Sequence, residues 1–429
     1  MSFKIKVIFY LLSLKIHKKI YSRNINRLQN IRWKRLKNKI SKSEYYKNFI
    51  ELNTPLKDYP LMNKTLFISN FNLINTEGIN YKEANKIAIR AEAERDFSSK
   101  VNNITVGLSS GTSGNRGIFL ASDKERAQWV AAILDRVINF SFKKRTVAFF
   151  LRANSNLYES VKSRLIEFKY FDLLLPLDEH VQGLKKYQPD ILVAQPSLLL
   201  QLAKHKEAGD LNIEPKKIIS VAEVLYEEDA NYLRSVFGKI IHQVYQCTEG
   251  FLASSCSYGT LHFNEDFLII EKKYIDNEKK RFHPIVTDLK RTSQPVIRYE
   301  LDDIIHEKTN CPCGGKSIAI EMIEGRSDDV LEFINDQKKR SIIFPDFFRR
   351  AIILSNENIR NYSLSQKSYN HLLLYVDGDE NNYSKAETAL YNLLRQKKIL
   401  NVFIERVNEL NWEVGSKLRR IKNEIRTTN

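Results

Sequence analysis

Short runs of apolar residues alternate with stretches of helical periodicity through the middle of the chain. Five runs occur: TVAFFL at 146–151, FDLLLP at 171–176, DILVAQP at 190–196, KIISVA at 217–222 and KIIHQVY at 239–245. Short apolar runs without strict alternation are typical of strands buried on both faces, and the helical stretches between them suit crossover connections. The pattern predicts an α/β fold with parallel strands and flanking helices.

The pattern differs on either side of this region. Upstream, residues 20–52 and 81–97 are predicted to form polar helices, and residues 122–142 an amphipathic helix. From about 257 to 323 the segments become shorter and alternate more regularly between apolar and polar residues, which is typical of antiparallel strands. We therefore expect a large domain with mixed sheets.

After Asp328 the strand and helix patterns start again. IIF, HLLLYV, a helix near 384–396 and VFIERV suffice for a small α+β domain. The predicted organisation has three parts: a basic amphipathic arm at 1–40, a core domain at 41–328 and a mobile C-terminal lid domain at 329–429.

Composition adds that the basic character belongs to one end of the chain. The 429 residues are 43% apolar, enough to bury a large core in more than one domain. Of the net charge of +17, +13 lies in residues 1–42, which contain no Asp or Glu. Nucleic-acid binding is not expected, because neither an aromatic-interleaved basic sheet nor a recognition-helix pattern accompanies this charge.

The basic arm contains an apolar run, VIFYLLSL at 7–14, flanked by lysines. Eight residues are too few to span a bilayer, and no small-residue cleavage site of a secretory signal follows. Two interpretations stay open: residues 1–20 form an amphipathic helix on an anionic membrane surface, or they pack on the protein and display lysines to water. The expected location is cytoplasmic, and under the first interpretation also peripheral, at the inner face of the membrane.

A loop rich in glycine and hydroxyl residues, SSGTSGNRG at 109–117, lies between short predicted strands at 104–108 and 118–120. Its glycines let the backbone approach a ligand closely, and its successive N–H groups can form an anion-binding concavity. Arg116 can grip a phosphate with two hydrogen bonds. The loop lacks the P-loop spacing. It is therefore a candidate phosphate site of another kind, although a Ser/Gly surface turn has the same composition.

The cysteines suggest a metal site. There are only four, and no disulfide framework is expected in a reducing compartment. Cys256, His262, Cys311 and Cys313 make a tetrahedral ligand set for structural Zn²⁺, within a segment at 254–316. Reduced thiols without a metal are the alternative. Cys247 is interpreted as a small packing residue.

Four motifs follow the glycine-rich loop: YQCTEG at 245–250, RYELDD at 298–303, EGRSDD at 324–329 and GSKLRR at 415–420. With the strings LRANSNLYES, SVAEVL and LHFNED, they resemble the acyl-adenylate-forming superfamily of acyl-CoA synthetases, nonribosomal-peptide adenylation domains and luciferases. The resemblance is greatest to the phenylacetate–CoA ligase and coenzyme F synthetase-like branch, and within it to hypothetical proteins of polysaccharide gene clusters. The resemblance is strong over residues 40–350. It weakens over the last 80 residues, until the GSKLRR motif.

The resemblance implies the adenylate-forming ligase fold and an ATP site. Tyr245 would stack on adenine, Thr248 would hydrogen-bond a phosphate, and Glu249 would bind Mg²⁺, which prefers oxygen ligands. SVAEVL resembles the adenine-pocket turn and so implicates Ala222 and Glu223. The β- and γ-phosphates would lie on the glycine-rich loop, held by Ser109, Ser110, Gly111, Thr112, Ser113, Gly114 and Arg116.

The later motifs imply the remaining roles. Asp303 would accept hydrogen bonds from the ribose hydroxyls, and Arg326 would contact ribose or phosphate. Asp328 resembles the hinge of the C-terminal domain. Lys417 would stabilise charge on the α-phosphate as a carboxylate attacks, so Lys417, Thr248, Glu249 and Arg326 are the predicted catalytic residues. Some phenylacetate–CoA ligase-like relatives carry zinc at positions resembling the Cys₃His set.

The implied reaction is ATP-dependent activation of a small carboxylic acid, followed by transfer to CoA, to another thiol, or to an amine or surface-glycan precursor. Nucleotidyl transfer to a hydroxyl, as in the coenzyme F synthetase-like relatives, and a membrane-associated scaffold that binds nucleotide without turnover are the alternatives. Arg116-Gly117 replaces the common Pro-Lys of the phosphate loop, and Leu301-Asp302 replaces Thr-Gly, which leaves the preference between ATP and GTP open. The pocket region around Gln195 and Ser197 indicates no single acid.

Overall fold

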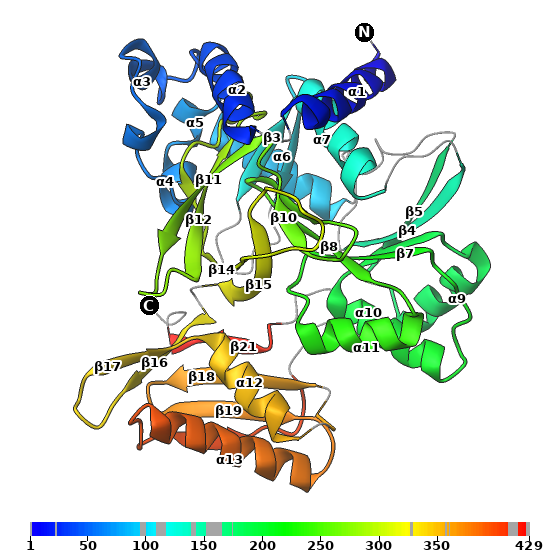
Figure 1. Ribbon diagram of the computed structural model, residues 1–429, viewed down its shortest axis with the longest axis vertical. Helices are drawn as coiled ribbons and strands as arrows, with labels where there is room; N and C mark the ends of the chain where they lie inside the picture. Colours follow the sequence, from blue (N-terminus) through cyan, green and yellow to red (C-terminus); the bar gives the residue numbers. More distant parts are fainter. Residues whose placement is uncertain are drawn as a thin grey trace. The chain divides into compact units, whose positions relative to one another are not determined.

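The computed structural model (Figure 1) describes residues 2–21, 24–94, 100–108, 117–138, 143–151, 165–173, 175–326, 329–356, 358–359, 361–410 and 419–425. The chain divides into two compact units. The first unit comprises residues 1–301 and 307–322, and the second comprises 302–306 and 323–429. The predicted lid at 329–429 falls within the second unit.

Helices dominate the beginning of the first unit. They are α1 (Phe3–Tyr21), α2 (Ile25–Lys39), α3 (Lys47–Glu51), α4 (Lys64–Ser69), α5 (Phe71–Ile74) and α6 (Tyr81–Ala93). The prediction of one helix over 20–52 is wrong in its extent, because the chain leaves the helix after Lys39. The turn that follows is anchored where the Ser43 hydroxyl donates to the Leu73 carbonyl, 3.0 Å away.

Helix α1 packs on α7 (Asp123–Arg136) through one of its faces (Figure 1). Val7, Leu11 and Leu14 are buried there. Two interpretations of the N-terminal arm were open. For this face of α1 the structure shows the second one, packing on the protein. No helix among the described residues has the length and apolar character needed to cross a membrane.

A small antiparallel sheet contains β1 (Lys100–Val101), β2 (Ile104–Leu108) and β3 (Ile118–Ala121). The strands predicted on either side of the glycine-rich loop are thus confirmed, and the loop joins β2 to β3. Their apolar side chains pack against α6, with Val106, Ile118 and Leu120 in the same core cluster as Ala84 and Ala88.

The large sheet contains the predicted parallel strands. These are β4 (Arg145–Leu151), β5 (Ile166–Asp172), β6 (Ile191–Ala194), β7 (Lys217–Val221) and β8 (Ile241–Cys247), in the spatial order β5-β4-β6-β7-β8. Every neighbouring pair among them is parallel. The predicted strand at 171–176 is placed too late, since β5 ends at Asp172 and Leu173 already belongs to the following turn.

Helices cover these strands and complete a hydrophobic core. They are α9 (Leu177–Tyr187), α10 (Pro196–Glu207) and α11 (Glu227–Phe237) (Figure 1). Leu199 and Leu202 of α10 and Leu233 of α11 are fully buried against Leu192 and Ile218 of the sheet. This burial explains why β6 is apolar at every position.

Beyond β8 the sheet becomes antiparallel, as the alternating pattern predicts. Its further strands are β9 (Gly250–Ser255), β10 (Leu261–Phe263), β11 (Leu268–Tyr274), β12 (Arg281–Asp288), β13 (Tyr299–Glu300), β14 (Asp303–Lys308) and β15 (Ala319–Arg326). Strand β9 reverses the direction of β8, and β10 pairs with both β9 and β15.

The second unit has its own α+β core. Its elements are β16 (Leu331–Ile334), β17 (Arg340–Ile343), α12 (Pro345–Ser355), β18 (Tyr362–Ser368), β19 (His371–Val376), α13 (Glu380–Gln396), β20 (Phe403–Arg406) and β21 (Ile421–Asn423). Four of the strands form a sheet in the order β20-β19-β18-β21. Leu364, Leu374 and Leu390 are fully buried between this sheet and the helices.

A buried carboxylate joins α7 to the turn after β12 in the first unit. Glu125 completes a capping box with Ser122 at the start of α7. The same carboxylate accepts hydrogen bonds from the backbone N–H and the hydroxyl of Ser293, at 2.8 and 2.7 Å. Burial by itself raises the pKa of Glu125, but the hydrogen bonds from Ser122 and Ser293 outweigh it and hold the pKa below its usual value.

We expect Glu125→Gln to lower the free energy of unfolding by about 2–3 kcal/mol, because an amide can accept fewer of these hydrogen bonds and leaves buried donors unpaired. The depressed pKa means that the carboxylate's contribution is complete above about pH 4.3 and is lost as the pH falls through the folded-state value. Urea unfolding between pH 3 and 7 measures both effects. Exposed Glu278→Gln is the control, with an expected change below about 0.5 kcal/mol.

Candidate functional site

Two of the predicted nucleotide-binding motifs lie at the carboxyl ends of parallel strands. Strand β6 ends at Ala194, β7 at Val221 and β8 at Cys247. Because adjacent parallel strands run in the same direction, these three ends lie at one edge of the sheet. Ligands of open α/β sheets bind at this edge. The SVAEVL motif leaves β7 there, and YQCTEG turns from β8 into β9.

Thr248 and Glu249 form the turn of the YQCTEG motif. The Thr248 hydroxyl donates to Glu249 Oε2 at 2.9 Å, and both side chains are half-buried. Arg291 donates to the Thr248 carbonyl and so holds the turn from the segment after β12. The turn therefore presents a carboxylate and a hydroxyl beside each other. The carboxylate is a suitable ligand for Mg²⁺, and the hydroxyl can hydrogen-bond a phosphate.

Gly250 closes this turn against a buried acid. A Cβ atom at Gly250 would lie 3.1 Å from Asp288 Oδ2, so a larger residue would displace the carboxylate. Burial raises the pKa of Asp288, while its hydrogen bonds from the backbone of Lys290 and Arg291 act in the opposite direction. Close packing against Asp288 therefore favours glycine at this position of the motif.

Tyr245 and Gln246 occupy the end of β8 before the turn. The pairing of β8 with β9 shifts register between these two residues. The Tyr245 ring lies 6.4 Å from the Phe263 ring in an edge-to-face arrangement. The indole N–H of Trp129 on α7 donates to Gln246 Oε1 at 2.9 Å. Helix α7 is thereby tied to the motif.

Ala222 and Glu223 leave β7 in a sharp turn. Ala222 has φ of +69°, a left-handed conformation that is uncommon for a residue with a side chain. Glu223 accepts hydrogen bonds from the Ser197 backbone N–H at 3.1 Å and from its hydroxyl at 3.0 Å. Ser197 lies in the first turn of α10, whose N-cap residue Gln195 makes no side-chain cap. Glu223 therefore caps α10 from outside the helix.

The other predicted nucleotide-binding residues belong to the second unit or lie outside the described part of the chain. Asp303 begins β14 and Arg326 ends β15, both within the second unit. The remaining predicted residues lie outside the described part of the chain: Ser109, Ser110, Gly111, Thr112, Ser113, Gly114, Arg116, Asp328 and Lys417.

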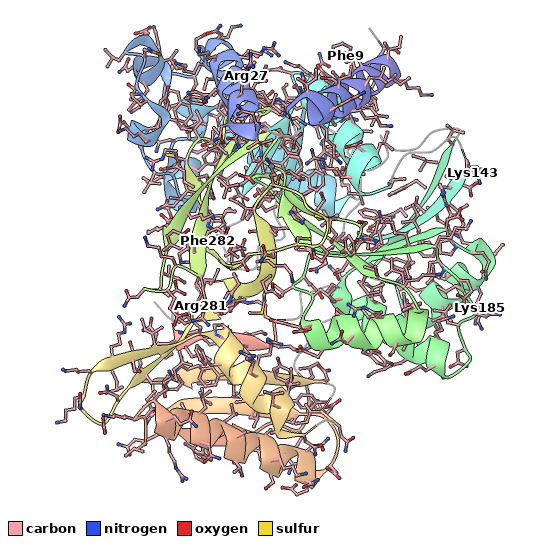
Figure 2. The ribbon with its side chains drawn as sticks, viewed as in Figure 1. Phe9, Arg27, Lys143, Lys185, Arg281 and Phe282 are labelled. Atoms are coloured by element: carbon pink, nitrogen blue, oxygen red, sulfur yellow. The ribbon has the colours of Figure 1, made fainter. Side chains whose placement is uncertain are left out.

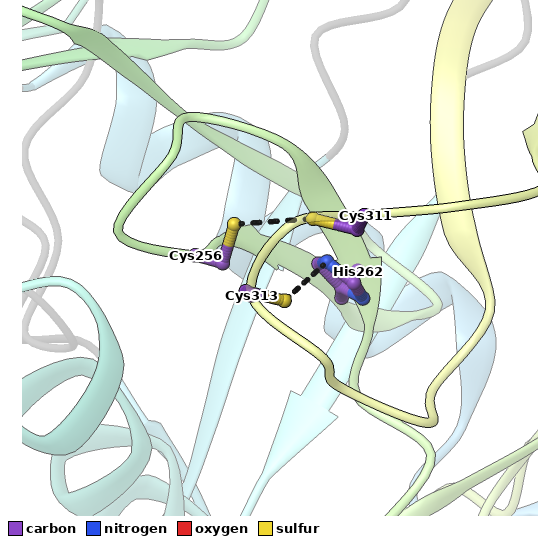
Figure 3. Close-up of side chains that lie close together, drawn as sticks. All are labelled: Cys256, His262, Cys311 and Cys313. Atoms are coloured by element: carbon purple, nitrogen blue, oxygen red, sulfur yellow. Dashed lines mark hydrogen bonds between the residues drawn. The ribbon is translucent and has the colours of Figure 1, made fainter.

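The predicted metal ligands come together in the first unit. We call Cys256, His262, Cys311 and Cys313 the Cys/His cluster (Figure 3); their ligand atoms all lie within 4.8 Å of one another. Cys256 follows β9, His262 lies on β10, and Cys311 and Cys313 lie in the loop between β14 and β15. The pairing of β10 with β9 and β15 brings these segments side by side.

The spacing within the Cys/His cluster suits a tetrahedral ion. Cys256 Sγ and Cys311 Sγ lie 3.7 Å apart, and Cys313 Sγ lies 3.4 Å from His262 Nε2. Ligands about 2.3 Å (sulfur) and 2.0 Å (nitrogen) from one tetrahedral Zn²⁺ are separated by about 3.5–3.8 Å. The residues present therefore fit the ion.

Neighbouring groups orient the ligands of the Cys/His cluster. His262 Nδ1 lies 3.1 Å from the Ser317 carbonyl, so a proton on Nδ1 leaves Nε2 facing the cysteines as an acceptor. The Gly315 N–H donates to Cys313 Sγ at 3.3 Å. Burial raises the pKa of the Cys311 thiol, but hydrogen bonds from Cys313 and His262 outweigh it and bring the pKa to about 6. A thiolate is the form that binds a metal.

No family model matches the chain. A 258-residue stretch is 24% identical to indoleacetate–lysine synthetase of Pseudomonas savastanoi, and the match covers 53% of this chain and 61% of that protein. Among solved structures, the chain is similar to 2-hydroxyisobutyryl-CoA ligase in the postadenylation state, in complex with 2-HIB-AMP. The TM-score is 0.64 and the sequence identity 17%, and the match covers 94% of this chain and 90% of that one. The amide bond synthetase McbA of Marinactinospora thermotolerans is similar with a TM-score of 0.51 and 11% identity, over 73% and 68%.

The chain has the fold of the adenylate-forming ligases. This confirms the fold that the motif resemblance implies. The level of identity establishes the fold and leaves substrates to be proposed. Within this adenylate-forming fold, three contacts of the described site were missed by sequence reasoning: Trp129 with Gln246, Arg291 with Thr248, and Glu223 with Ser197. No local sequence signal joins residues so far apart in the chain.

The capping contact can be tested by a double-mutant cycle. We expect Glu223→Gln and Ser197→Ala each to lower the free energy of unfolding by about 1 kcal/mol, because either change removes the cap of α10. The double variant should cost clearly less than the two single costs together. Urea denaturation of the four proteins measures this coupling, and strictly additive costs would show that the contact contributes nothing.

Proposed function

We propose that the chain activates a carboxylic acid with ATP, forming an acyl-adenylate and pyrophosphate. The observation that carries the proposal is the Thr248–Glu249 turn at the carboxyl edge of a sheet with the adenylate-forming ligase fold. A similar solved structure holds an acyl-adenylate, 2-HIB-AMP. Electrostatic stabilisation of the reacting phosphates is the main task of such a site.

The chain's residues then have distinct tasks. Glu249 would hold Mg²⁺, Thr248 would hydrogen-bond a phosphate, and Tyr245 would pack on the adenine. Ala222 would shape the adenine pocket, while Glu223 supports it by capping α10. The glycine-rich loop, Asp303 and Arg326 would hold the phosphates and ribose, Asp328 would be the hinge, and Lys417 of the 329–429 lid would meet the α-phosphate.

The second step transfers the acyl group to a nucleophile and releases AMP. Two acceptor classes have support from the comparisons. The 2-hydroxyisobutyryl-CoA ligase is also known in complex with CoA. McbA is named an amide bond synthetase, and the relative from Pseudomonas savastanoi is named for indoleacetate and lysine, an amine-bearing acceptor. We propose a thiol or an amine as the acceptor, and a surface-glycan precursor, through a sugar or an amine group, as a further class.

A panel of carboxylates, each assayed for pyrophosphate release with ATP and with GTP, tests the proposal. At least one acid should give pyrophosphate, and CoA or an amine should then convert the adenylate to free AMP. A stable nucleotide adduct on a hydroxyl substrate would instead indicate nucleotidyl transfer. Nucleotide binding without pyrophosphate release across the panel would indicate a scaffold without turnover.

Once an acid that is a substrate is identified, Glu249→Gln should lower the rate of pyrophosphate release by about 10²-fold. The reason is that the amide is a weaker Mg²⁺ ligand than the carboxylate, so that the phosphate charge is less well neutralised. The dependence of the rate on Mg²⁺ should move to higher concentration. Exposed Glu278→Gln serves as the matched control and should keep the original rate. An unchanged Mg²⁺ dependence in Glu249→Gln would remove Glu249 from the site.

We also propose that the Cys/His cluster holds a structural Zn²⁺. All four ligand positions are filled by side chains of the chain, which suits a closed structural site. The ion would link the β9–β10 turn to the loop between β14 and β15, as a cross-link that reducing conditions leave intact.

The purified chain should contain about one equivalent of zinc, and Cys313→Ser should lose it, because three remaining ligands bind far more weakly. Cys247→Ser is the matched control, since Cys247 lies outside the cluster and should leave the zinc content unchanged. Elemental analysis by mass spectrometry measures the metal. Less than about a tenth of an equivalent in the unaltered chain would refute the assignment.

Finally, we propose that α1 associates with an anionic membrane surface. One face of α1 packs on α7, but large apolar side chains on its other side are exposed. Lysines flank this surface, and basic amphipathic helices with such a pattern bind at the interface of anionic bilayers.

A further inference from the structure

Helix α1 has two apolar faces. Val7, Leu11 and Leu14 face α7 and are buried. The opposite side of the helix carries large apolar residues that are each 54–63% exposed, with Phe9 visible on α1 in Figure 2. We call this set the outer stripe: Ile5, Ile8, Phe9, Leu12, Ile16 and Ile20. A contiguous exposed apolar stripe of this kind marks an interaction surface.

A cavity of about 240 Å³ adjoins the outer stripe in the first unit. It lies beside α1 and is lined by α2, the first turns of α7 and the segment after β12. Phe9 belongs both to the stripe and to the cavity wall, and further apolar lining comes from Leu14 and Leu36. None of the described residues of the wall is acidic, and the rest of it includes His17 and five lysine and arginine side chains: Arg32, Arg35, Lys39, Lys124 and Lys290.

The acids behind the cavity are already engaged. Asp266 pairs with Arg136 at 2.6 Å and with Arg32 at 3.8 Å, so one carboxylate serves two guanidinium groups. Arg32 also donates to His17 Nδ1 at 3.1 Å, which holds that imidazole as a neutral acceptor. Burial and the adjacent Arg32 lower the pKa of His17 accordingly.

Burial also affects two lysines of the cavity wall. Burial and the neighbouring ammonium group of Lys39 lower the pKa of Lys124 to about 8. Burial lowers the pKa of Lys290 to about 7, although Asp266 and Asp288 act in the opposite direction. Burial is the main cause of both shifts, so each ammonium group is charged at a free-energy cost that a bound anion would reduce.

We propose that this cavity binds the phosphate of an anionic phospholipid while the outer stripe lies in the interface of the bilayer. The inference rests on the proposed membrane association of α1 and adds a headgroup site to it. A basic wall suits phosphate, and the apolar wall around Phe9 and Leu14 suits the glycerol and first acyl carbons. A free phosphorylated metabolite would leave the outer stripe without an occupant.

The experiment compares vesicle binding by the full chain at equal vesicle surface charge. One set of vesicles contains phosphatidic acid, whose phosphomonoester is exposed, and the other contains phosphatidylserine, whose phosphate is covered by serine. We expect about 10-fold tighter binding to phosphatidic acid. The cavity variant Lys39→Gln/Lys124→Gln should abolish this preference, and it should fold normally because it removes a repulsion between two ammonium groups.

The matched control is Lys15→Gln/Lys18→Gln, which removes the same charge from α1 outside the cavity. It should weaken binding to both vesicles by about 30-fold, at about 1 kcal/mol for each lysine, and keep the preference. Leu12→Ser/Ile16→Ser should weaken both as well, since it alters the outer stripe.

Four results would overturn the proposal in different ways. Equal binding of the unaltered chain to both anionic vesicles, or a preference that survives in the cavity variant, would remove the headgroup site and leave membrane association standing. No binding to any anionic vesicle would remove both. If inorganic phosphate binds the chain without vesicles as tightly as phosphatidic acid vesicles do, the site is one for a soluble phosphate and the lipid assignment is wrong.

Discussion

Parallel pairing of β4, β6, β7 and β8 is the constraint on which the first unit depends. Because these strands share a direction, the turns after β6, β7 and β8 meet at one edge of the sheet. The SVAEVL and YQCTEG segments are neighbours for this reason alone. Strand β9 then carries the chain away from that edge, so the Thr248–Glu249 turn and Cys256 lie at opposite ends of β9. This separation along β9 suits the structural role that we propose for the Cys/His cluster.

Buried and half-buried carboxylates connect this part of the sheet to neighbouring elements. Glu125 bridges α7 and Ser293, Glu223 caps α10, and Asp288 packs under Gly250. Each carboxylate is satisfied by backbone N–H groups or hydroxyls, which makes its burial tolerable. The turns that would meet a nucleotide are thus fixed by polar contacts from outside the sheet as well as by strand pairing.

The sequence predicts the strands of this fold well because burial on both faces forces apolar runs. It also predicts the Cys/His cluster, since few residue types bind zinc and strand pairing preserves their order. It misplaces β5, because Leu173 is apolar yet belongs to a turn. It merges α2 and α3 into one helix, because the interruption depends on the contact of Ser43 with Leu73, thirty residues away in the chain. Contacts such as Trp129 with Gln246 have no local signature, since only tertiary packing brings the two residues together.

Helix α7 connects two surfaces that the chain keeps far apart in sequence. Lys124 lines the basic cavity, and Trp129, five residues later, holds Gln246 beside the Thr248–Glu249 turn. Five residues of α-helix span only about 7.5 Å. Because a helix is rigid over this length, a displacement of α7 along its axis at Lys124 would also move the Trp129 indole and alter its hydrogen bond to Gln246 at the end of β8.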